Sequence, residues 1–537
     1  MGRYLNSSTS YVLYKGQTEQ PYFVDKSQML SELFPFLDSG NTHICITRPR
    51  RFGKTVMANM ITAFLGKKQD SDSIFKSLKI SQNDLYSKYR NQYNVISIDF
   101  SKMPRDCDSY TDYIDRIETN LIRDLRKEYP QIEIYEDDSA ADVLETIFEE
   151  CDQQRFVFVL DEWDFIFHKD FVTEENKKQY VLFLSNLLKD RSYVQLTYMT
   201  GILPIAKYSS GSELNMFWEY TMASEAKYNE YFGFTDSEVD QLYEKYTRNT
   251  REIHISREDL KEWYDGYTTK SGERMYNPKS VVLALTNNNI GNYWTSSGPY
   301  DEIFYYIRQN IDDVQNDLAS MISGEAVTAK VQEYAAVSMN LTTKNEIFSA
   351  MIVYGFLSYE NGKVRIPNKE LMEKFDEMLQ KEKSLGYIYR LAKESDKMLQ
   401  ATLANDTQTM EKILSYVHDT ETPILSYNHE TELSAIVNLA YLSARDQYRI
   451  EREDKAGKGF VDFIFYPYDR AADRVILELK VDKTPEYAIS QIKEKQYALR
   501  FKGKLAGKQQ FTGRILAVGI NYDKETKQHR CKVEEIK

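Results

Sequence analysis

The sequence predicts an α/β protein, because apolar strand-like runs alternate with helix-like segments in two separate stretches of the 537-residue chain. Apolar residues make up 42% of the chain and charged residues 28%, which is the balance of a globular protein with buried cores. The length exceeds what a single core normally supports, so we expect two to four domains.

The composition also restricts location and partners. The four cysteines stand far apart in the sequence, which predicts a reducing cytoplasm rather than a disulfide framework. No apolar run approaches the roughly 20 residues that cross a bilayer, so we expect no membrane partner. The net charge of −13 disfavours a protein that coats nucleic acid by charge alone.

The first alternation predicts a mostly parallel sheet within residues 1–232. An apolar strand over 43–47 leads through the basic loop RPRRFGKT (48–55) into an apolar-periodic helix over 56–65. The run before Asp161 is apolar at five successive positions, which suits a strand buried on both faces. The remaining elements expected here are helices over 28–39, 108–128 and 174–190, and strands over 94–100, 155–164 and 193–201.

After residue 232 helical patterns take over. A capping box at Thr235–Glu238 and a capped proline start at Asn277-Pro278 predict a helical lid or winged-helix-like domain over 233–320. Residues 321–420 are expected to form a helical connector with one hairpin at Asn361-Gly362. Strand and helix patterns alternate again over 421–537, the last expected domain.

Gly53-Lys54-Thr55 stands between a predicted strand and helix, where a phosphate-binding loop belongs. Backbone N–H groups and the helix N-terminus favour phosphate there, Lys54 can reach the β- and γ-phosphates, and Thr55 can ligate Mg²⁺. The standard pattern has glycine where Arg48 stands, so a basic turn before a helix remains an alternative. Arg48, Arg50 and Arg51 could contact phosphate, although a solvated loop is the default expectation for them, and Arg51 is included among the predicted phosphate contacts.

Asp161-Glu162 ends a strand roughly a hundred residues later. In such an arrangement the aspartate holds Mg²⁺ through water and the glutamate polarises the attacking water. A strand-end turn with solvated charges is the alternative, but the order of loop and acids favours a nucleotide site. Asp164 is expected to support the site structurally, and Thr200-Gly201 is either an ATPase sensor or a turn cap.

The segments RPRRFGKT, FVFVLDEWD, TYMTGILPIAK, WYDGY and MYNPKSV make residues 15–300 resemble the AAA-ATPase-like family of P-loop proteins, which is related to the signal-transducing ATPases. The resemblance implies ATP as the cofactor, bound by Lys54, Thr55, Asp161 and Glu162. It also implies that Arg48 is usual in this loop. Whether ATP is hydrolysed or acts as a switch stays open.

A second constellation lies near the C-terminus. FVDFIF (460–465) and RVILELKV (474–481) predict neighbouring strands, and Glu478 and Lys480 point to one face because they are two residues apart. Asp462 and Glu478 can then share Mg²⁺ or Mn²⁺, which lowers the pKa of bound water, with Lys480 beside them. Taken alone, Glu-x-Lys is also a common solvent-facing pair.

Two predicted helices flank these strands. The helix over 429–446 places Glu432 at the edge of its apolar stripe, and the helix over 485–500 places Gln491 and Lys495 on one face. The chain from Glu478 onward carries 14 basic and 8 acidic residues, a net of 14 − 8 = +6, which suits a phosphodiester substrate.

This C-terminal segment resembles the PD-(D/E)XK nuclease superfamily, in particular the subgroup often fused behind AAA-ATPase-like domains. The resemblance implies an α/β nuclease-like domain with a catalytic set of Glu432, Asp462, Glu478 and Lys480. It also implies supporting roles for the helix motif that contains Gln491, Lys495 and Tyr497.

These observations lead to one functional hypothesis and two alternatives. The hypothesis is a bacterial, ATP-controlled, metal-dependent endonuclease, with DNA favoured over RNA, in defence or mobile-element biology. The alternatives are an ATP-dependent regulator that binds without cleaving, and a signalling scaffold. A homo-oligomer stays open. The predicted metal ligands are Thr55, Asp161, Asp462 and Glu478, and Glu162 joins the catalytic set.

Overall fold

The computed structural model describes residues 2–205, 213–222, 225–294, 301–331, 341–420, 430–456, 459–501 and 511–536. Contacts divide the chain into two units. The first comprises Met1–Pro299, Ala329–Gly362 and Pro367–Glu370, and the second comprises Tyr300–Thr328, Lys363–Ile366 and Leu371–Lys537. The four-segment division expected from the sequence stays a prediction.

A five-stranded sheet organises the first unit. Its order is β2-β3-β4-β1-β5, and every neighbouring pair is parallel. The carboxyl ends of the strands therefore meet at one edge of the sheet. The strands are β1 (Thr42–Thr47), β2 (Asn94–Asp99), β3 (Phe156–Asp161), β4 (Val194–Gly201) and β5 (Phe217–Tyr220).

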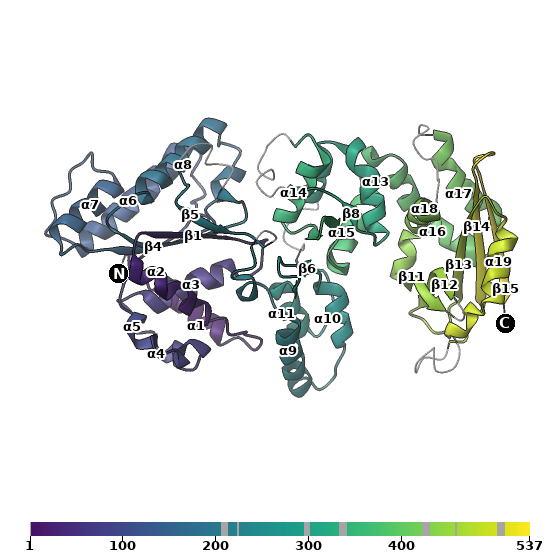
Figure 1. The fold of residues 1–537 in the computed structure, drawn as a ribbon, viewed down its shortest axis with the longest axis horizontal. Helices are drawn as coiled ribbons and strands as arrows, with labels where there is room; N and C mark the ends of the chain where they lie inside the picture. Colours follow the sequence, from purple (N-terminus) through teal and green to yellow (C-terminus); the bar gives the residue numbers. More distant parts are fainter. Residues whose placement is uncertain are drawn as a thin grey trace. The chain divides into compact units, whose positions relative to one another are not determined.

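Helices cover both faces of this sheet (Figure 1). One face carries α1 (Thr9–Thr18), α2 (Met29–Ser39), α3 (Lys54–Leu65), α4 (Asp72–Phe75) and α5 (Tyr86–Tyr89). The other carries α6 (Tyr110–Glu128), α7 (Ala140–Glu150) and α8 (Glu174–Leu188). Every residue of β3 is buried, as the uninterrupted apolar run predicts for a strand covered on both sides. The predicted α/β fold is confirmed here.

Helices dominate the rest of the first unit. The capping box at Thr235 and Glu238 is present, and the Asn277 side chain accepts from two backbone N–H groups ahead of Pro278. Both predicted helix starts are therefore confirmed. The elements are α9 (Asp236–Asn249), α10 (Arg257–Tyr264), β6 (Tyr267–Thr268), β7 (Arg274–Met275), α11 (Pro278–Asn287), α14 (Lys344–Val353) and β9 (Ser358–Glu360).

The second unit begins with a helical part. Helix α15 (Lys369–Lys381) starts in the first unit and continues in the second. Asn361 and Gly362 both take positive φ, as a tight hairpin turn requires. The other elements are α12 (Asp301–Ile307), α13 (Ile311–Ile322), β8 (Val327–Thr328), β10 (Lys363–Arg365), α16 (Tyr387–Leu403) and α17 (Thr407–Thr420).

A second five-stranded sheet, ordered β11-β12-β13-β14-β15, closes the chain. Strands β13 and β14 are parallel and the other pairs antiparallel. Helix α19 (Pro485–Glu494) lies on one side of it, and α16 and α18 (Glu430–Ala440) on the other (Figure 1). The strands are β11 (Tyr448–Ala456), β12 (Gly459–Pro467), β13 (Arg474–Val481), β14 (Ile515–Asp523) and β15 (Gln528–Ile536).

Two helices are shorter than predicted. The helix expected over 429–446 ends at Ala440 and is followed by a 3₁₀ turn, and residue 429 lies outside the described residues. The helix expected over 485–500 ends at Glu494, because Gln496 takes a left-handed φ of 56° that no α-helix accommodates. Lys495 is therefore a helix-capping residue rather than an interior one.

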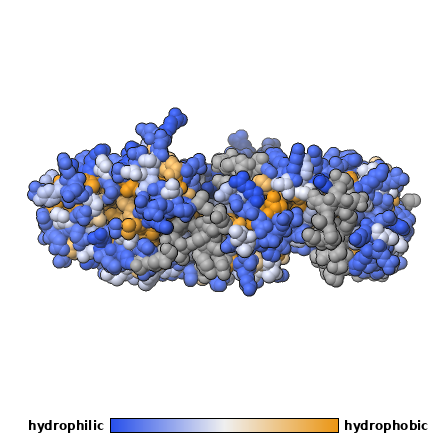
Figure 2. Space-filling model, turned by 90° about the horizontal axis from the view of Figure 1, so that it is seen from above, coloured by the Kyte–Doolittle hydropathy of each residue, from blue (hydrophilic) through white to orange (hydrophobic). Residues whose placement is uncertain are grey.

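Most apolar side chains of the described residues are buried in cores rather than exposed on the surface. Within the described ranges, no helix is long and apolar enough to cross a membrane. The face seen in Figure 2 is largely hydrophilic, and hydrophobic residues gather on it only in small patches.

Candidate functional site

The loop between β1 and α3 has the backbone form of a phosphate cradle. Arg51 and Gly53 take left-handed φ values of 69° and 96°, and α3 begins directly afterwards at Lys54. Glycine adopts this conformation freely, whereas an L-residue such as arginine spends roughly 1–2 kcal/mol on it. The loop thereby brings the N-terminus of α3, with its free N–H groups, to the edge where the strands end.

Lys54 lies inside this loop, with only 4% of its surface exposed. Its Nζ donates to the carbonyl oxygens of Arg48 (3.1 Å) and Pro49 (3.2 Å). The same atom lies 3.9 Å from Oε1 of Glu162. The predicted lysine and the predicted strand-end acid are therefore brought together.

Asp161 and Glu162 end β3 beside that lysine. Burial, followed by the charge of Glu162, raises the pKa of Asp161 to about 7, while a hydrogen bond with Thr55 opposes the rise. Burial also raises the pKa of Glu162, against the charge of Lys54. Asp161 is buried and Glu162 is partly exposed beside it, so a cation between them would favour the charged form of both acids.

Asp99 adds a third acid that the sequence analysis did not single out. It ends β2 opposite Asp161, and its charge contributes to the raised pKa of Asp161. A signal was available, since Asp99 ends an apolar strand just as Asp161 does, and parallel strands end at one edge.

Asp164 and β4 support the site from behind. The Asp164 carboxylate is buried and accepts from the backbone N–H groups of Ile202 and Leu203 (2.8 Å). At Gly201 a Cβ atom would meet Trp163 at 2.4 Å, so a side chain does not fit. Thr200 donates from Oγ1 to the carbonyl of Ile46 (2.8 Å), which ties β4 to β1.

Arg48, which stands where the standard loop has glycine, is a structural residue. It is 1% exposed, so a solvated position for it is wrong. Its guanidinium donates to the carbonyl oxygens of Thr47 and Tyr220 and to the Asn229 side chain, and it lies over the Phe232 ring. Arg48 therefore ties the base of the loop to β5 and the segment after it.

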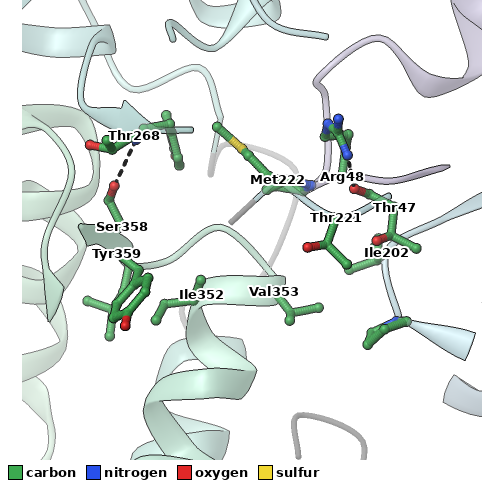
Figure 3. A pocket seen from close by; sticks show the side chains of 14 residues that line it. Thr47, Arg48, Ile202, Thr221, Met222, Thr268, Ile352, Val353, Ser358 and Tyr359 are labelled. Atoms are coloured by element: carbon green, nitrogen blue, oxygen red, sulfur yellow. Dashed lines mark hydrogen bonds between the residues drawn. The ribbon is translucent and has the colours of Figure 1, made fainter. Parts of the chain in front are cut away.

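Two cavities border the loop. The larger, of about 690 Å³, is lined by loop residues 50–57, Glu162, aromatic side chains including Tyr22 and Phe234, and helix α11. That volume is in the range of small-molecule and cofactor sites. The smaller, of about 40 Å³, lies beside Arg48, where the Thr268 backbone donates to Oγ of Ser358 (Figure 3), and it has room for water only.

The second set of predicted residues meets on β12 and β13. Phe463 pairs with Leu477 in this antiparallel ladder, which places Asp462 opposite Glu478. Oδ2 of Asp462 accepts from the backbone N–H of Leu479 (2.7 Å). The predicted hairpin return is therefore confirmed, and the two acids are neighbours.

Glu478 is 2% exposed, and its two carboxylate oxygens differ in their hydrogen bonding. Its Oε1 accepts from Nζ of Lys480 (3.0 Å) and from Nε2 of Gln491. Its Oε2 is buried and has no hydrogen-bond partner among the described residues. Burial and then the charge of Asp462 raise the pKa of Glu478 to about 7. A buried carboxylate oxygen without a partner is costly, and a divalent cation would satisfy it.

Lys480 is the cation of this site, with 5% of its surface exposed. Burial alone lowers its pKa, but Glu478, Asp462 and Glu430 together raise it, so it is held protonated. Oε1 of Glu430 lies 3.6 Å from its Nζ. The sequence analysis named Glu432 instead; that residue belongs to α18, and its side chain lies outside the described set.

The helix motif after β13 reaches the acid pair through Gln491. Tyr497 is fully buried and shares a hydrogen bond with Gln491, the residue that reaches Glu478. Gln491 therefore connects Tyr497 to the acid pair. Within the described side chains, no group of three or more His, Cys, Asp or Glu is placed to hold a metal.

The two sites define two classes of domain. A phosphate loop followed by strand-end acids on a parallel sheet is the site of a P-loop ATPase-like domain, and a mixed sheet with Asp and Glu-x-Lys is that of a nuclease-superfamily domain. Family models agree with both. Residues 14–210 match the family described as predicted AAA-ATPase, and residues 430–531 match the PD-(D/E)XK nuclease superfamily.

Individual relatives are distant. A curated protein of Azotobacter chroococcum, described as an uncharacterized protein in the vnfD 5′ region, is 24% identical over 284 residues, covering 52% of this chain and 51% of the relative. The chain thus spans about half the length of that relative.

Solved structures that are similar include a Walker-type ATPase of Pyrococcus abyssi (8% identity, TM-score 0.36, 65% of this chain and 95% of that one). The ORC2 protein of Aeropyrum pernix gives 12% identity and a TM-score of 0.33, over 66% of this chain and 93% of that one. A STAND protein with a tetratricopeptide repeat sensor from Pyrococcus horikoshii gives 12% and 0.23, over 79% and 54%.

Proposed function

We propose that this protein is an ATP-controlled, metal-dependent nuclease. Its ATPase-like domain would bind ATP, and its nuclease-superfamily domain would cleave nucleic acid when ATP is bound. The observation that carries the cleavage half is the buried Glu478 carboxylate, which binds Lys480 through one oxygen and whose other oxygen has no partner in the part of the chain that the structure describes.

At the nucleotide site the proposed contacts follow from the loop geometry. Lys54 would exchange its bonds with two loop carbonyls for bonds with phosphate oxygens, which are stronger acceptors because they are charged. Thr55 and Asp161, which share a hydrogen bond, would hold Mg²⁺. Glu162, beside Lys54, would orient water, and Gly53 and Arg51 complete the phosphate contacts.

At the second site Asp462 and the free oxygen of Glu478 would hold the metal ion. Hard carboxylate oxygens suit Mg²⁺, with Mn²⁺ as the substitute. When bound, such an ion supplies charge for the phosphodiester and lowers the pKa of a coordinated water. Lys480, kept protonated by its acidic neighbours, would stabilise negative charge that develops on the phosphate. Glu432 stays a proposed member of the catalytic set.

The biological setting belongs to the same proposal. A nuclease-superfamily domain with a net positive C-terminal segment favours nucleic acid as the partner, and we favour DNA over RNA. A bacterial cytoplasm, with a role in defence or mobile-element biology, fits the bacterial origin of the curated relative.

A cleavage assay tests this proposal. The full chain would be incubated with plasmid DNA, single-stranded DNA and RNA in Mg²⁺ or Mn²⁺, with and without ATP. We expect cleavage that Lys480→Ala reduces at least about 100-fold, because the variant loses the group that stabilises transition-state charge. Lys493→Ala is the matched control, since Lys493 is an exposed lysine that pairs with Glu534.

The same assay decides between this proposal and a non-cleaving regulator. The regulator is favoured by one observation, since Lys480 and Gln491 already satisfy Glu478 in part, as a purely structural network would. If wild type and Lys480→Ala are equally inert under every condition, the nuclease proposal is wrong and ATP-dependent binding is the better account.

A further inference from the structure

Glu370 is a buried carboxylate far in sequence from the phosphate loop. It is the second residue of α15 and is 1% exposed. Its Oε1 accepts from the backbone N–H groups of Tyr293 (2.7 Å) and Trp294 (2.6 Å), and both of its oxygens lie 2.9 Å from Oγ of Ser280. Its backbone carbonyl accepts from Nδ2 of Asn292 (2.8 Å). Glu370 therefore anchors residues 292–294, which we call the strap.

The strap in turn holds the phosphate loop. Nη1 of Arg51 donates to the carbonyl of Tyr293 (2.6 Å), and Nε1 of Trp294 donates to the carbonyl of Arg50 (3.3 Å). Arg50 and Arg51 both line the 690 Å³ cavity beside Lys54. A continuous set of hydrogen bonds thus joins Glu370, through the strap, to the two arginines that border the nucleotide cavity.

Electrostatic attraction between Glu370 and Arg51 adds to these hydrogen bonds. The Glu370 carboxylate and the Arg51 guanidinium attract each other, each opposing the effect of burial on the other's pKa. Arg51 also holds a left-handed backbone conformation that an L-residue adopts only when its surroundings compensate. Two hydrogen bonds to the strap provide that compensation, one from the Arg51 side chain and one to the carbonyl oxygen of the Arg50–Arg51 peptide.

We propose that Glu370 is a positioning residue for nucleotide binding. It holds the strap against the phosphate loop and so fixes Arg50 and Arg51 where they can meet the phosphate groups. This inference rests on the proposed nucleotide site. Because Leu371 already belongs to the second unit, the anchor also lies at one of the places where the chain passes from one unit to the other.

Two substitutions distinguish the role of Glu370 as a hydrogen-bond acceptor from the role of its negative charge. Glu370→Ala removes the acceptor of both strap N–H groups. Glu370→Gln keeps it, because the amide oxygen can take the Oε1 position while the amide nitrogen faces the Ser280 hydroxyl, which can accept. Glu377→Ala is the matched control, since Glu377 lies on the same helix and pairs with Lys374 and Lys381 at the surface.

The measurement is the affinity of the full chain for ATP and for AMP, by calorimetry in Mg²⁺. We expect Glu370→Ala to weaken ATP at least about tenfold, the cost of a lost buried acceptor, and to change AMP much less. Glu370→Gln should weaken ATP by a smaller factor and Glu377→Ala should have no effect. In an Arg51→Met background the loss caused by Glu370→Ala should shrink, since its target is gone.

Two results would overturn the inference. One is ATP affinity in Glu370→Ala equal to wild type, and the other is an equal loss for ATP and AMP, which marks a merely structural role. If Glu370→Ala does not fold, as judged by thermal unfolding, Glu370→Gln against Glu377→Ala decides alone. Lys54→Ala distinguishes failure of the proposed nucleotide site from failure of the role proposed for Glu370. If Lys54→Ala binds ATP normally, the nucleotide site itself is misassigned.

Discussion

The phosphate-loop site and the Glu-x-Lys site both contain a buried lysine and a buried carboxylate, but the lysine has different hydrogen-bond partners in each. Each places a lysine that is about 95% buried beside a carboxylate whose pKa burial raises to about 7, Asp161 in one and Glu478 in the other. In the first site Nζ of Lys54 bonds to two backbone carbonyls and lies 3.9 Å from Oε1 of Glu162. In the second, Nζ of Lys480 bonds directly to Glu478.

That difference separates an anion site from a cation site. Backbone carbonyls are weak neutral acceptors, so Lys54 is available to a phosphate that enters the adjoining cavity. Lys480 already pairs with Glu478, and the second site also offers a buried carboxylate oxygen that has no hydrogen-bond partner among the described residues. Two lysine–acid pairs of similar burial are thus suited to a nucleotide and to a metal ion.

The largest effect is expected at Lys54. Lys54→Ala should weaken ATP binding at least about 100-fold, because it removes a charge-assisted contact with the phosphates. Calorimetry with ATP and Mg²⁺ measures this directly. Lys68→Ala is the control, since that lysine is half-exposed and pairs with Glu128. An unchanged affinity in Lys54→Ala would remove the anion side of the comparison.

A stability effect is expected next, at Asp164. Asp164→Ala leaves the buried N–H groups of Ile202 and Leu203 without their acceptor and should lower the free energy of unfolding by about 2–4 kcal/mol. Urea unfolding of the full chain, followed by a signal from the first unit, tests it. A loss below about 0.5 kcal/mol, typical of surface sites, would mean that Asp164 does not support the strand ends.

The cation side is tested by Glu478→Gln. The wild-type chain should gain thermal stability when Mn²⁺ is added, since a ligand that binds only the folded state stabilises it by RT ln(1 + c/Kd), where c is the free ligand concentration. Glu478→Gln should lose most of that gain, while Glu486→Gln, on the surface of α19, should keep it. Equal gains in both variants would place the metal elsewhere.

The smallest effect concerns pH and Glu370. Burial raises its pKa from 4.5 to about 7, although hydrogen bonds from Trp294, Ser280 and Tyr293 and the charge of Arg51 oppose the rise. Between those values the folded chain keeps a proton that the unfolded chain has released. The free energy of unfolding should therefore fall as pH rises through this window, by up to about 1.4 kcal/mol per pH unit, relative to Glu370→Gln. Parallel curves for the two proteins would contradict the raised pKa.

The sequence predicted local features better than long-range ones. The order of β1, loop and α3, the two capped helix starts and the Asp462–Glu478 hairpin all follow from patterns within single short stretches of the sequence. Strand β11 was not predicted, because its YRIEREDKA sequence carries charges at most positions, and it sits at a sheet edge where charge is tolerated.

The site residues that the sequence did not reveal depend on tertiary contacts. Glu430 lies near Lys480, and only its place on α18 relative to β13 brings the two side chains together. Arg48 was expected to be solvated, yet it is buried and its guanidinium donates to backbone carbonyl oxygens of β1 and β5. Glu370 carries no local motif, since its role arises only where the strap and α15 meet.

The central claim, that one chain uses nucleotide binding to control metal-dependent cleavage, is tested most directly by a single comparison. Wild type, Lys54→Ala and Lys480→Ala would be incubated with plasmid DNA and Mg²⁺, with and without ATP. We predict that ATP changes the cleavage rate of wild type, that Lys54→Ala cleaves without responding to ATP, and that Lys480→Ala is inert throughout. Cleavage by wild type and Lys480→Ala at the same rate, or an ATP response that survives in Lys54→Ala, would contradict the account.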